Sequence, residues 1–142
     1  MTKTYIIAEI SANHLQSFET AEKLIVSAKG AGADAVKVQC FTPDTLTIDS
    51  RDKGFLVSTG MPWEGRPLYD LYKEATMPWN WIPRLMDLAK TFELDFFSSV
   101  YDKTSVDFME KLNPPYLKIA SFELVDLELL KYAAQTKITL IL

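Results

Sequence analysis

The sequence alternates short apolar runs with longer segments of helical periodicity, and this alternation constrains the fold more than any other feature. The apolar runs have the length of buried β-strands and lie at residues 5–10, 35–40, 95–99, 116–120 and 139–142. Every intervening segment is long enough to connect two parallel strands. The run at 35–40 is apolar at nearly every position, which is typical of a sheet covered on both faces. The pattern predicts a parallel α/β fold.

The segments between these runs carry helix start and stop signals. Ser17 is placed to cap a helix whose apolar positions repeat until Gly30 and Gly32. Residues 41–66 contain prolines and glycines without a sustained period, which predicts a long loop with room for a short hairpin, and such loops are usually functional. Further helices are predicted over residues 68–75, 79–91 (with Pro83 in the first turn), 103–111 (capped by Asp102) and 127–135.

Two folds use this alternation, the doubly wound sheet and the (β/α)8 barrel. The motif G-x-G-x-x-G does not follow the first apolar run, which weakens the dinucleotide-binding interpretation. A barrel takes about 250 residues and eight βα units, so the 142 residues hold about four and a half units. We therefore predict a TIM-type barrel that is truncated to these first units, and the apolar run that stops at Leu142 agrees with truncation.

Charge and composition exclude several classes of function. Fifteen basic and nineteen acidic residues give a net charge of −4, so the overall charge recruits neither nucleic acid nor an anionic membrane, and a bound anion needs a local site. The sequence has no signal peptide and no apolar run of about 20 residues, which predicts a cytoplasmic protein. The single cysteine, Cys40, is expected in the core, and the single histidine, His14, is expected to hydrogen-bond within its loop.

Polar side chains interrupt the predicted strands near their C-terminal ends. Side chains alternate along a strand, so each polar residue shares a face with the residue two positions before it. The C-terminal ends are also where both parallel α/β folds bind ligands. The polar residues are Glu9 in the first strand, Lys37 and Gln39 in the second, Ser98 and Ser99 in the third and Lys118 in the fourth, with Ser121 directly after it.

These residues predict an anion site. Two lysines against one carboxylate leave a positive charge for an anion, and Glu9 is left to handle protons. The hydroxyls of Ser99 and Ser121 are donors that a phosphate or carboxylate needs. Two other interpretations stay open: a structural ion-pair cluster of Glu9 with Lys37 or Lys118, and a lysine that forms a Schiff base. The serines favour the anion site.

Four stretches resemble, in order and spacing, the N-terminal half of the barrel of the sialic acid synthase family. They are IIAEISANH at 6–14, AGADAVKVQ at 31–39, FFSS at 96–99 and YLKIAS at 116–121, and the resemblance covers the whole chain. Residues 41–49, 68–75 and 120–126 are most similar to the pseudaminic acid synthase branch. N-acetylneuraminate synthases typically carry Gly-Ser-Gly-Glu at the positions of 120–123. N-acetylneuraminate and legionaminate synthases are the alternatives.

The resemblance implies condensation of phosphoenolpyruvate with the open-chain aldehyde of a 2,4-diacetamido-2,4,6-trideoxy hexose of the altrose type. The products are a nine-carbon 2-keto sugar acid and phosphate, and a divalent metal, Mn or Mg, orients and polarises the aldehyde. Carried over by motif, Glu9 is the general base or acid, Gln39 faces the sugar and Glu123 lies near the metal through water. Phosphoenolpyruvate is held by Lys37, Ser99, Lys118 and Ser121.

The sequence also departs from the family pattern. Ser99 stands where the family has a phosphate-binding threonine, and Val100 replaces the usual proline. The resemblance places the metal-binding histidines, the later strands and a C-terminal antifreeze-like (SAF) domain beyond Leu142. We therefore expect a homodimer for the full-length protein and no synthase activity from these 142 residues alone. Alternatives from other classes are a non-catalytic fragment that associates through strand edges and a small domain that binds a phosphorylated ligand.

Overall fold

One parallel sheet of five strands organises the molecule. The computed structural model describes residues 3–142. Its strands are β1 (Ile7–Glu9), β2 (Ala35–Cys40), β3 (Asp95–Val100), β4 (Tyr116–Ile119) and β5 (Thr139–Ile141). Each strand pairs in parallel with the next one along the chain, in the order β1-β2-β3-β4-β5. The predicted strands are confirmed, with bounds that differ by at most about two residues, as expected for such boundaries.

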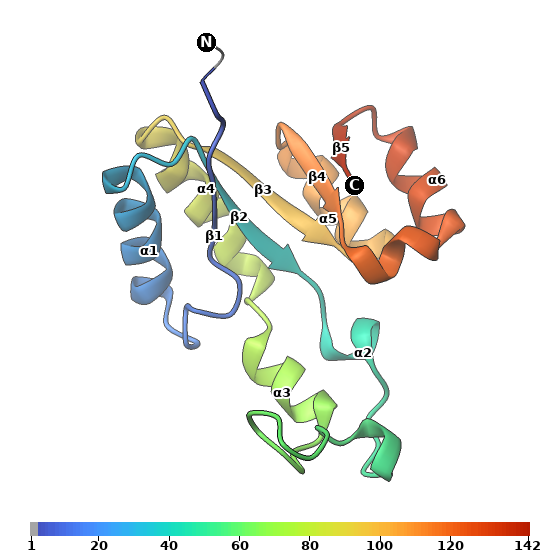
Figure 1. The fold of residues 1–142 in the computed structure, drawn as a ribbon. Helices are drawn as coiled ribbons and strands as arrows, with labels where there is room; N and C mark the ends of the chain where they lie inside the picture. The colour runs from blue at the N-terminus through green and yellow to red at the C-terminus, as the bar shows by residue number, and fades with distance from the viewer. Residues whose placement is uncertain (1–2) are drawn as a thin grey trace.

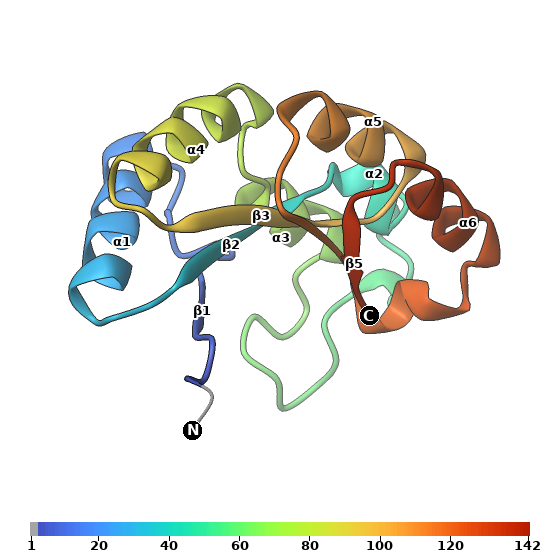
Figure 2. The ribbon, with the colours of Figure 1, turned by 90° about the horizontal axis from the view of Figure 1, so that it is seen from above.

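Four helices cover one face of the sheet. Figure 2 shows α1 (Phe18–Gly30), α4 (Ile82–Thr91), α5 (Lys103–Leu112) and α6 (Leu127–Gln135) along the convex side of the curved strands. In a doubly wound fold the strand order reverses and helices lie on both faces. Sequential strand order with helices outside is the arrangement in the wall of a (β/α) barrel. The barrel-type α/β fold is confirmed, and the doubly wound alternative is wrong for residues 3–142.

Local signals position these helices. Ser17 Oγ accepts a hydrogen bond from the Thr20 amide at 3.2 Å, and the Asp102 carboxylate accepts one from the Ser105 amide at 2.9 Å, so both predicted caps form. The helix predicted over 79–91 is split, because a 3-10 turn, η2 (Trp79–Trp81), precedes α4. The split leaves Pro83 in the first turn of α4, where its missing N–H breaks no hydrogen bond. Among residues 3–142, every helix is too short or too polar to cross a bilayer.

The core lies between the sheet and these helices. Cys40 is fully buried there as predicted, and burial raises the pKa of its thiol. The Ser98 hydroxyl also faces the core and donates to the Val38 carbonyl at 3.3 Å, so Ser98 does not belong to the predicted anion site. The apolar members of the core include Val36, Val38, Phe96, Leu117 and Ile119 from the strands and Ile25, Leu85, Met109 and Leu129 from the helices.

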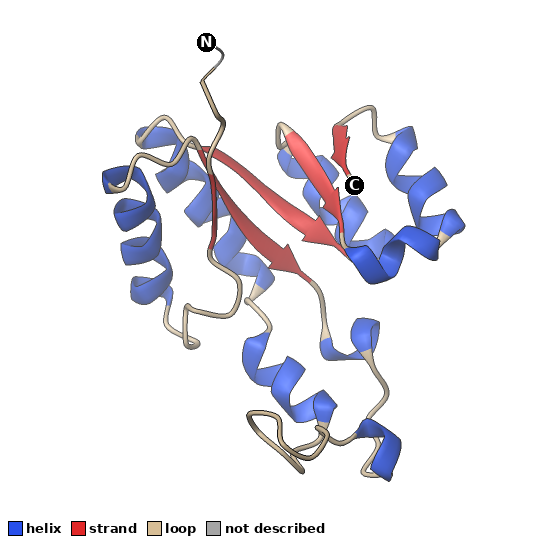
Figure 3. Cartoon of the chain, in the orientation of Figure 1, coloured by secondary structure: helices blue, strands red, loops and turns tan. Residues whose placement is uncertain are grey.

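The predicted long loop is an ordered excursion beyond the C-terminal end of β2. It contains the short helix α2 (Pro43–Leu46), the 3-10 turn η1 (Lys53–Phe55) and α3 (Leu68–Ala75). Figures 1 and 3 show these short helices past the arrowheads of β2 and β3. A single antiparallel bridge joins Leu56 to Pro67 where the sequence left room for a hairpin. The excursion therefore stands at the end of the sheet where ligands bind.

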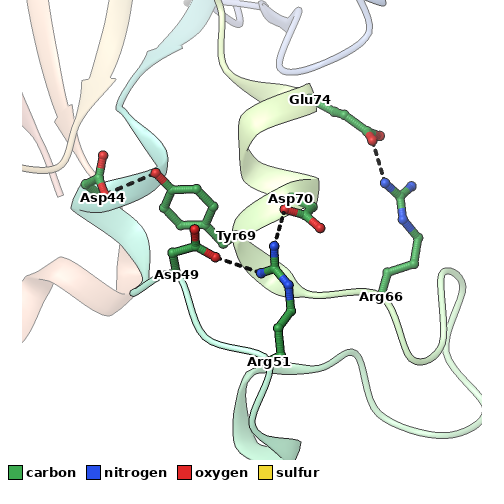
Figure 4. Close-up of polar contacts among 7 residues, drawn as sticks. All are labelled: Asp44, Asp49, Arg51, Arg66, Tyr69, Asp70 and Glu74. Atoms are coloured by element: carbon green, nitrogen blue, oxygen red, sulfur yellow. Dashed lines mark hydrogen bonds and ion pairs between the residues drawn. The ribbon is translucent and has the colours of Figure 1, made fainter.

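Polar contacts between distant parts of the excursion hold its shape (Figure 4). The Arg51 guanidinium contacts Asp49 at 2.7 Å and Asp70 at 3.2 Å, which ties the loop to α3. The remaining contacts are the hydrogen bond from the Tyr69 hydroxyl to Asp44 at 3.2 Å and the ion pair of Arg66 with Glu74. Each exposed pair contributes only about 0–1 kcal/mol, so their joint action matters more than any one of them.

Candidate functional site

The strand register brings the predicted polar residues to one face of the sheet. Glu9 is level with Lys37 on the neighbouring strand. Gln39 is level with Ser99, and Ser99 with Lys118. Residues that are level on parallel strands, or two apart on one strand, point to the same side. All five therefore lie on the face turned away from the helices, as the alternation predicted.

Lys37 is the most connected of these side chains. Its Nζ forms an ion pair with the Glu9 carboxylate and donates to Ser99 Oγ at 3.1 Å. The Lys37 side chain is 11% exposed, whereas that of Glu9 is 38% exposed. The other carboxylate oxygen of Glu9 accepts a hydrogen bond from the Ser11 amide at 2.9 Å. This pair matches the structural ion-pair interpretation, which accounts for only one of the two lysines.

Lys118 differs from Lys37 in its partners. Its half-buried Nζ contacts only the carbonyl of Ile119, at 3.4 Å. Within residues 3–142, no carboxylate lies within the 4.0 Å of an ion pair with it. A half-buried ammonium without a counter-charge is unfavourable by itself and favours the binding of an anion.

Aromatic side chains share this face with the polar residues, because Phe97 is level with Lys37. Phe97 is fully buried and meets Tyr116 edge-to-face, with ring centroids 5.5 Å apart. Tyr5 meets Tyr116 at 6.3 Å, and its hydroxyl donates to Asp95. The face turned away from the helices thus carries Glu9 and Lys37 beside the ring of Phe97. Gln39, Ser99 and Lys118 lie two residues farther along the strands. The candidate site therefore extends from the level of Lys37 and Phe97 to the C-terminal ends of the strands.

Two predicted residues lie on a turn that the sequence did not predict. Ser121 and Glu123 both belong to the 3-10 turn η3 (Ser121–Val125), which follows β4. Ser121 is exposed at the start of the turn. Glu123 is half-buried, and its buried Oε2 has no hydrogen-bond partner within residues 3–142. A buried carboxylate oxygen without a partner is a group that a ligand or water can satisfy.

Tyr101 is a residue of this site that sequence reasoning missed. Its hydroxyl lies next to the Ser99 side chain and experiences the negative charges of Glu123 and Glu9. Burial first, and then these two carboxylates, raise the pKa of Tyr101 to about 12, so the phenol stays protonated. The available signal was its position two residues after Ser99, which continues the alternation of β3 past its end.

His14 and Gln16 fasten the loop after β1 to the end of α3. The fully buried His14 ring accepts a hydrogen bond from the Gln16 amide through Nδ1, at 3.1 Å, and meets Trp81 edge-to-face at 5.8 Å. The Gln16 side chain donates to the carbonyls of Glu74 and Thr76, at 2.6 and 2.7 Å. The predicted role of His14 as a loop hydrogen-bonder is confirmed.

His14→Gln is expected to flatten the dependence of stability on pH. Burial lowers the pKa of His14 below its ordinary value of 6.5, so below that pH the unfolded chain takes up a proton that the folded chain resists. Stability contributed by neutral His14 is present above pH 6.5 and falls as the pH is lowered. Between pH 7.5 and 5.5, the loss in free energy of unfolding should shrink by up to about 1.4 kcal/mol in the variant. Urea titrations at both pH values measure this, and equal losses in both proteins contradict it.

The described residues do not form a metal centre by themselves. No three His, Cys, Asp or Glu side chains gather as metal ligands within residues 3–142. The only histidine is the buried His14, which packs against Trp81. Glu9 and Glu123, the two carboxylates near Tyr101, are fewer ligands than a protein metal site usually supplies.

Comparison with known proteins gives matches along the chain. The family model described as NeuB family matches residues 24–142. Pseudaminic acid synthase of Helicobacter pylori is 41% identical over 137 residues, which are 96% of this chain and 40% of that protein. N,N'-diacetyllegionaminic acid synthase of Legionella pneumophila is 33% identical over 138 residues, covering 97% of this chain and 38% of that protein. The chain thus spans about 40% of the length of the curated relatives it matches.

A solved structure has the same fold. The crystal structure of N-acetylneuraminic acid (sialic acid) synthetase from Leptospira borgpetersenii, in complex with citrate, superposes with a TM-score of 0.82. The superposition covers 98% of this chain and 44% of that chain, at 22% sequence identity. At this identity the likeness concerns the fold, and it agrees with the sequential sheet and outer helices described above.

Proposed function

Because this chain belongs to the NeuB family, we propose that residues 1–142 are the N-terminal part of the barrel of a phosphoenolpyruvate-dependent synthase of nine-carbon sugar acids, of the pseudaminic acid type. The higher identity to the pseudaminic acid synthase than to the legionaminic acid synthase, 41% against 33%, supports the branch. The observation that carries the proposal is the half-buried Lys118, which has no counter-charge within residues 3–142, beside the linked side chains of Lys37 and Ser99. We infer a cytoplasmic homodimer for the full-length protein, on the family resemblance.

The charges of phosphoenolpyruvate fit the strand-end lysines. The molecule carries a phosphate and a carboxylate, so it needs several cationic or hydrogen-bonding groups at short range. Lys118 supplies an ammonium that pairs with no carboxylate of the described residues, and Lys37 supplies a second one that is already linked to Ser99. Ser99 and Ser121 add hydroxyl donors from the ends of β3 and β4. We assign these four residues to phosphoenolpyruvate. The Schiff-base interpretation is left aside on the family resemblance, and for Lys37 also because Glu9 holds it in an ion pair.

Glu9 is the proton-handling group of the proposal. C3 of phosphoenolpyruvate forms a bond to the aldehyde carbon, which leaves a negative charge on the aldehyde oxygen and a positive charge at C2. Water then adds at C2 and gives one proton to the Glu9 carboxylate, which passes it to the aldehyde oxygen. The other water proton leaves with the phosphate when the bond between C2 and the phosphate oxygen breaks and C2 becomes the keto carbon. Gln39, two residues beyond Lys37 on the same face, is assigned to the sugar.

The proposal is tested on the protein encoded by the complete gene. With phosphoenolpyruvate, 2,4-diacetamido-2,4,6-trideoxy-altrose and Mn²⁺, we expect one phosphate per 2-keto acid formed. N-acetylmannosamine should be used at least about tenfold less efficiently. A preference for N-acetylmannosamine favours the N-acetylneuraminate alternative, and no phosphate release with either sugar contradicts the proposal. The 142-residue chain alone is expected to bind phosphoenolpyruvate without turnover. The divalent metal implied by the family resemblance, with Glu123 near it through water, remains a prediction. None of the proton transfers described above depends on it.

A further inference from the structure

Three aromatic rings meet where the excursion joins the strand ends. Phe41, the first residue after β2, meets Tyr101 edge-to-face at 5.6 Å and Tyr72 of α3 at 6.2 Å. The Trp79 indole donates to the Phe41 carbonyl at 3.2 Å, which fixes the backbone of Phe41. The end of α3 is in turn held by Gln16. Phe41 is buried and supports the partly exposed rings of Tyr72 and Tyr101. We call these three rings the aromatic wall (Phe41, Tyr72 and Tyr101).

The charges around the aromatic wall differ from those around the lysines. The negative charges of Glu123 and Glu9 act on the Tyr101 hydroxyl and raise its pKa. Lys118 is level with Ser99, two residues before Tyr101, and so lies deeper along the strands. A phosphate beside Tyr101 meets the Glu123 carboxylate, which has no cationic partner within residues 3–142, and this is unfavourable, whereas the Glu9 carboxylate is paired with Lys37. A neutral ligand rich in hydroxyl and amide groups suits the position, because carboxylates accept its hydrogen bonds and aromatic rings pack against its carbon atoms.

We propose that Tyr101 binds the sugar substrate: its phenol O–H donates a hydrogen bond to a hydroxyl or acetamido oxygen of the acetamido sugar, next to the aromatic wall. The assignment rests on the proposed function and deepens it, because it adds a sugar-binding residue on the side of the excursion. The hydroxyl already lies beside Ser99, which receives a hydrogen bond from Lys37. Sugar and phosphoenolpyruvate therefore meet at the boundary between Tyr101 and Ser99, as condensation of the two requires.

Tyr101→Phe tests the inference in the protein encoded by the complete gene. The variant keeps the ring that packs on Phe41 and removes only the donor. We expect the KM for 2,4-diacetamido-2,4,6-trideoxy-altrose to rise about tenfold, while the dissociation constant of phosphoenolpyruvate, measured by calorimetry, stays within about twofold. Tyr132→Phe is the matched control. It removes a phenol that donates to Asp107 at 2.7 Å between α5 and α6, and it should leave both constants unchanged.

The outcomes separate this inference from the proposed function. If the wild-type protein does not bind phosphoenolpyruvate, the proposed function fails and the assignment of Tyr101 fails with it. If the wild-type protein is active and Tyr101→Phe keeps the KM for the sugar, only the assignment is overturned. The assignment is also overturned if Tyr101→Phe weakens the binding of phosphoenolpyruvate and leaves the KM for the sugar unchanged. If the variant does not fold, the ¹³C resonance of the Tyr101 Cζ in wild-type protein decides. The chemical shift of this resonance must change when the sugar is added and stay unchanged when phosphoenolpyruvate is added.

Discussion

Lys118→Met is expected to weaken phosphoenolpyruvate binding by about 100-fold, or about 2.7 kcal/mol, without lowering the free energy of unfolding. The two expectations have one physical cause. Lys118 is half-buried, and in the part of the chain that the structure describes its Nζ donates only to a carbonyl oxygen, so the folded protein gains nothing from its charge until an anion is bound. Replacement of an uncompensated charge by an apolar side chain of similar length is neutral or stabilising. A lysine with a purely structural role gives the opposite result, a loss of stability.

Calorimetric titration with phosphoenolpyruvate and urea unfolding measure the two quantities on the same preparations. Lys131→Met is the matched control, because Lys131 is exposed on α6 and pairs only with Glu128 at 3.3 Å. It makes the same change in net charge and should leave binding within about twofold, since a distant exposed charge is screened by salt. A wild-type dissociation constant in Lys118→Met, or a marked loss of stability, contradicts the assignment of Lys118 to the anion site.

The polar face was predictable because it depends on a local rule. Side chains alternate along a strand, so Lys37 and Gln39 had to share a face, and parallel register then placed Ser99 and Lys118 beside them. The choice between the two α/β folds was not local. It depends on which side of the sheet each helix packs, and the amphipathic pattern of a helix gives its buried stripe without saying which face of the sheet receives it. The sequential strand order and the position of the helices on one face identify the barrel-type fold.

The excursion shows why the rest was not predictable. Its shape depends on pairs that are distant in sequence, such as Arg51 with Asp70 and Gln16 with the carbonyl of Thr76. No periodic pattern encodes such pairs, because they form only after the strands have brought the segments together. The same holds for Tyr101, whose importance arises from Glu9 and Glu123 on other elements. The position of a residue along its own strand was predictable from the sequence. The side chains that other elements place around that residue were not.

Glu9→Gln is expected to lower kcat of the synthase encoded by the complete gene by about 100-fold to 10,000-fold, the usual contribution of a positioned acid or base. Binding of phosphoenolpyruvate should persist. The amide keeps the shape of the carboxylate and its contact with the Ser11 amide, but it takes up no proton from water. The change also frees Lys37 from its ion pair, so affinity for an anion should stay equal or increase. Rapid-quench measurement of phosphate release and calorimetry with phosphoenolpyruvate give the two quantities.

The measured kcat and phosphoenolpyruvate affinity of Glu9→Gln together show whether Glu9 transfers protons or only positions Lys37. If Glu9 acts only by holding Lys37, its removal disturbs the position of an anion-binding ammonium, and phosphoenolpyruvate affinity falls together with kcat. If Glu9 transfers protons, kcat falls alone. Glu19→Gln is the matched control, because Glu19 is exposed on α1 and pairs with Lys23 at 2.7 Å, so it should leave both constants unchanged. Wild-type kcat in Glu9→Gln contradicts the proton-transfer role, and a joint loss assigns Glu9 to positioning Lys37.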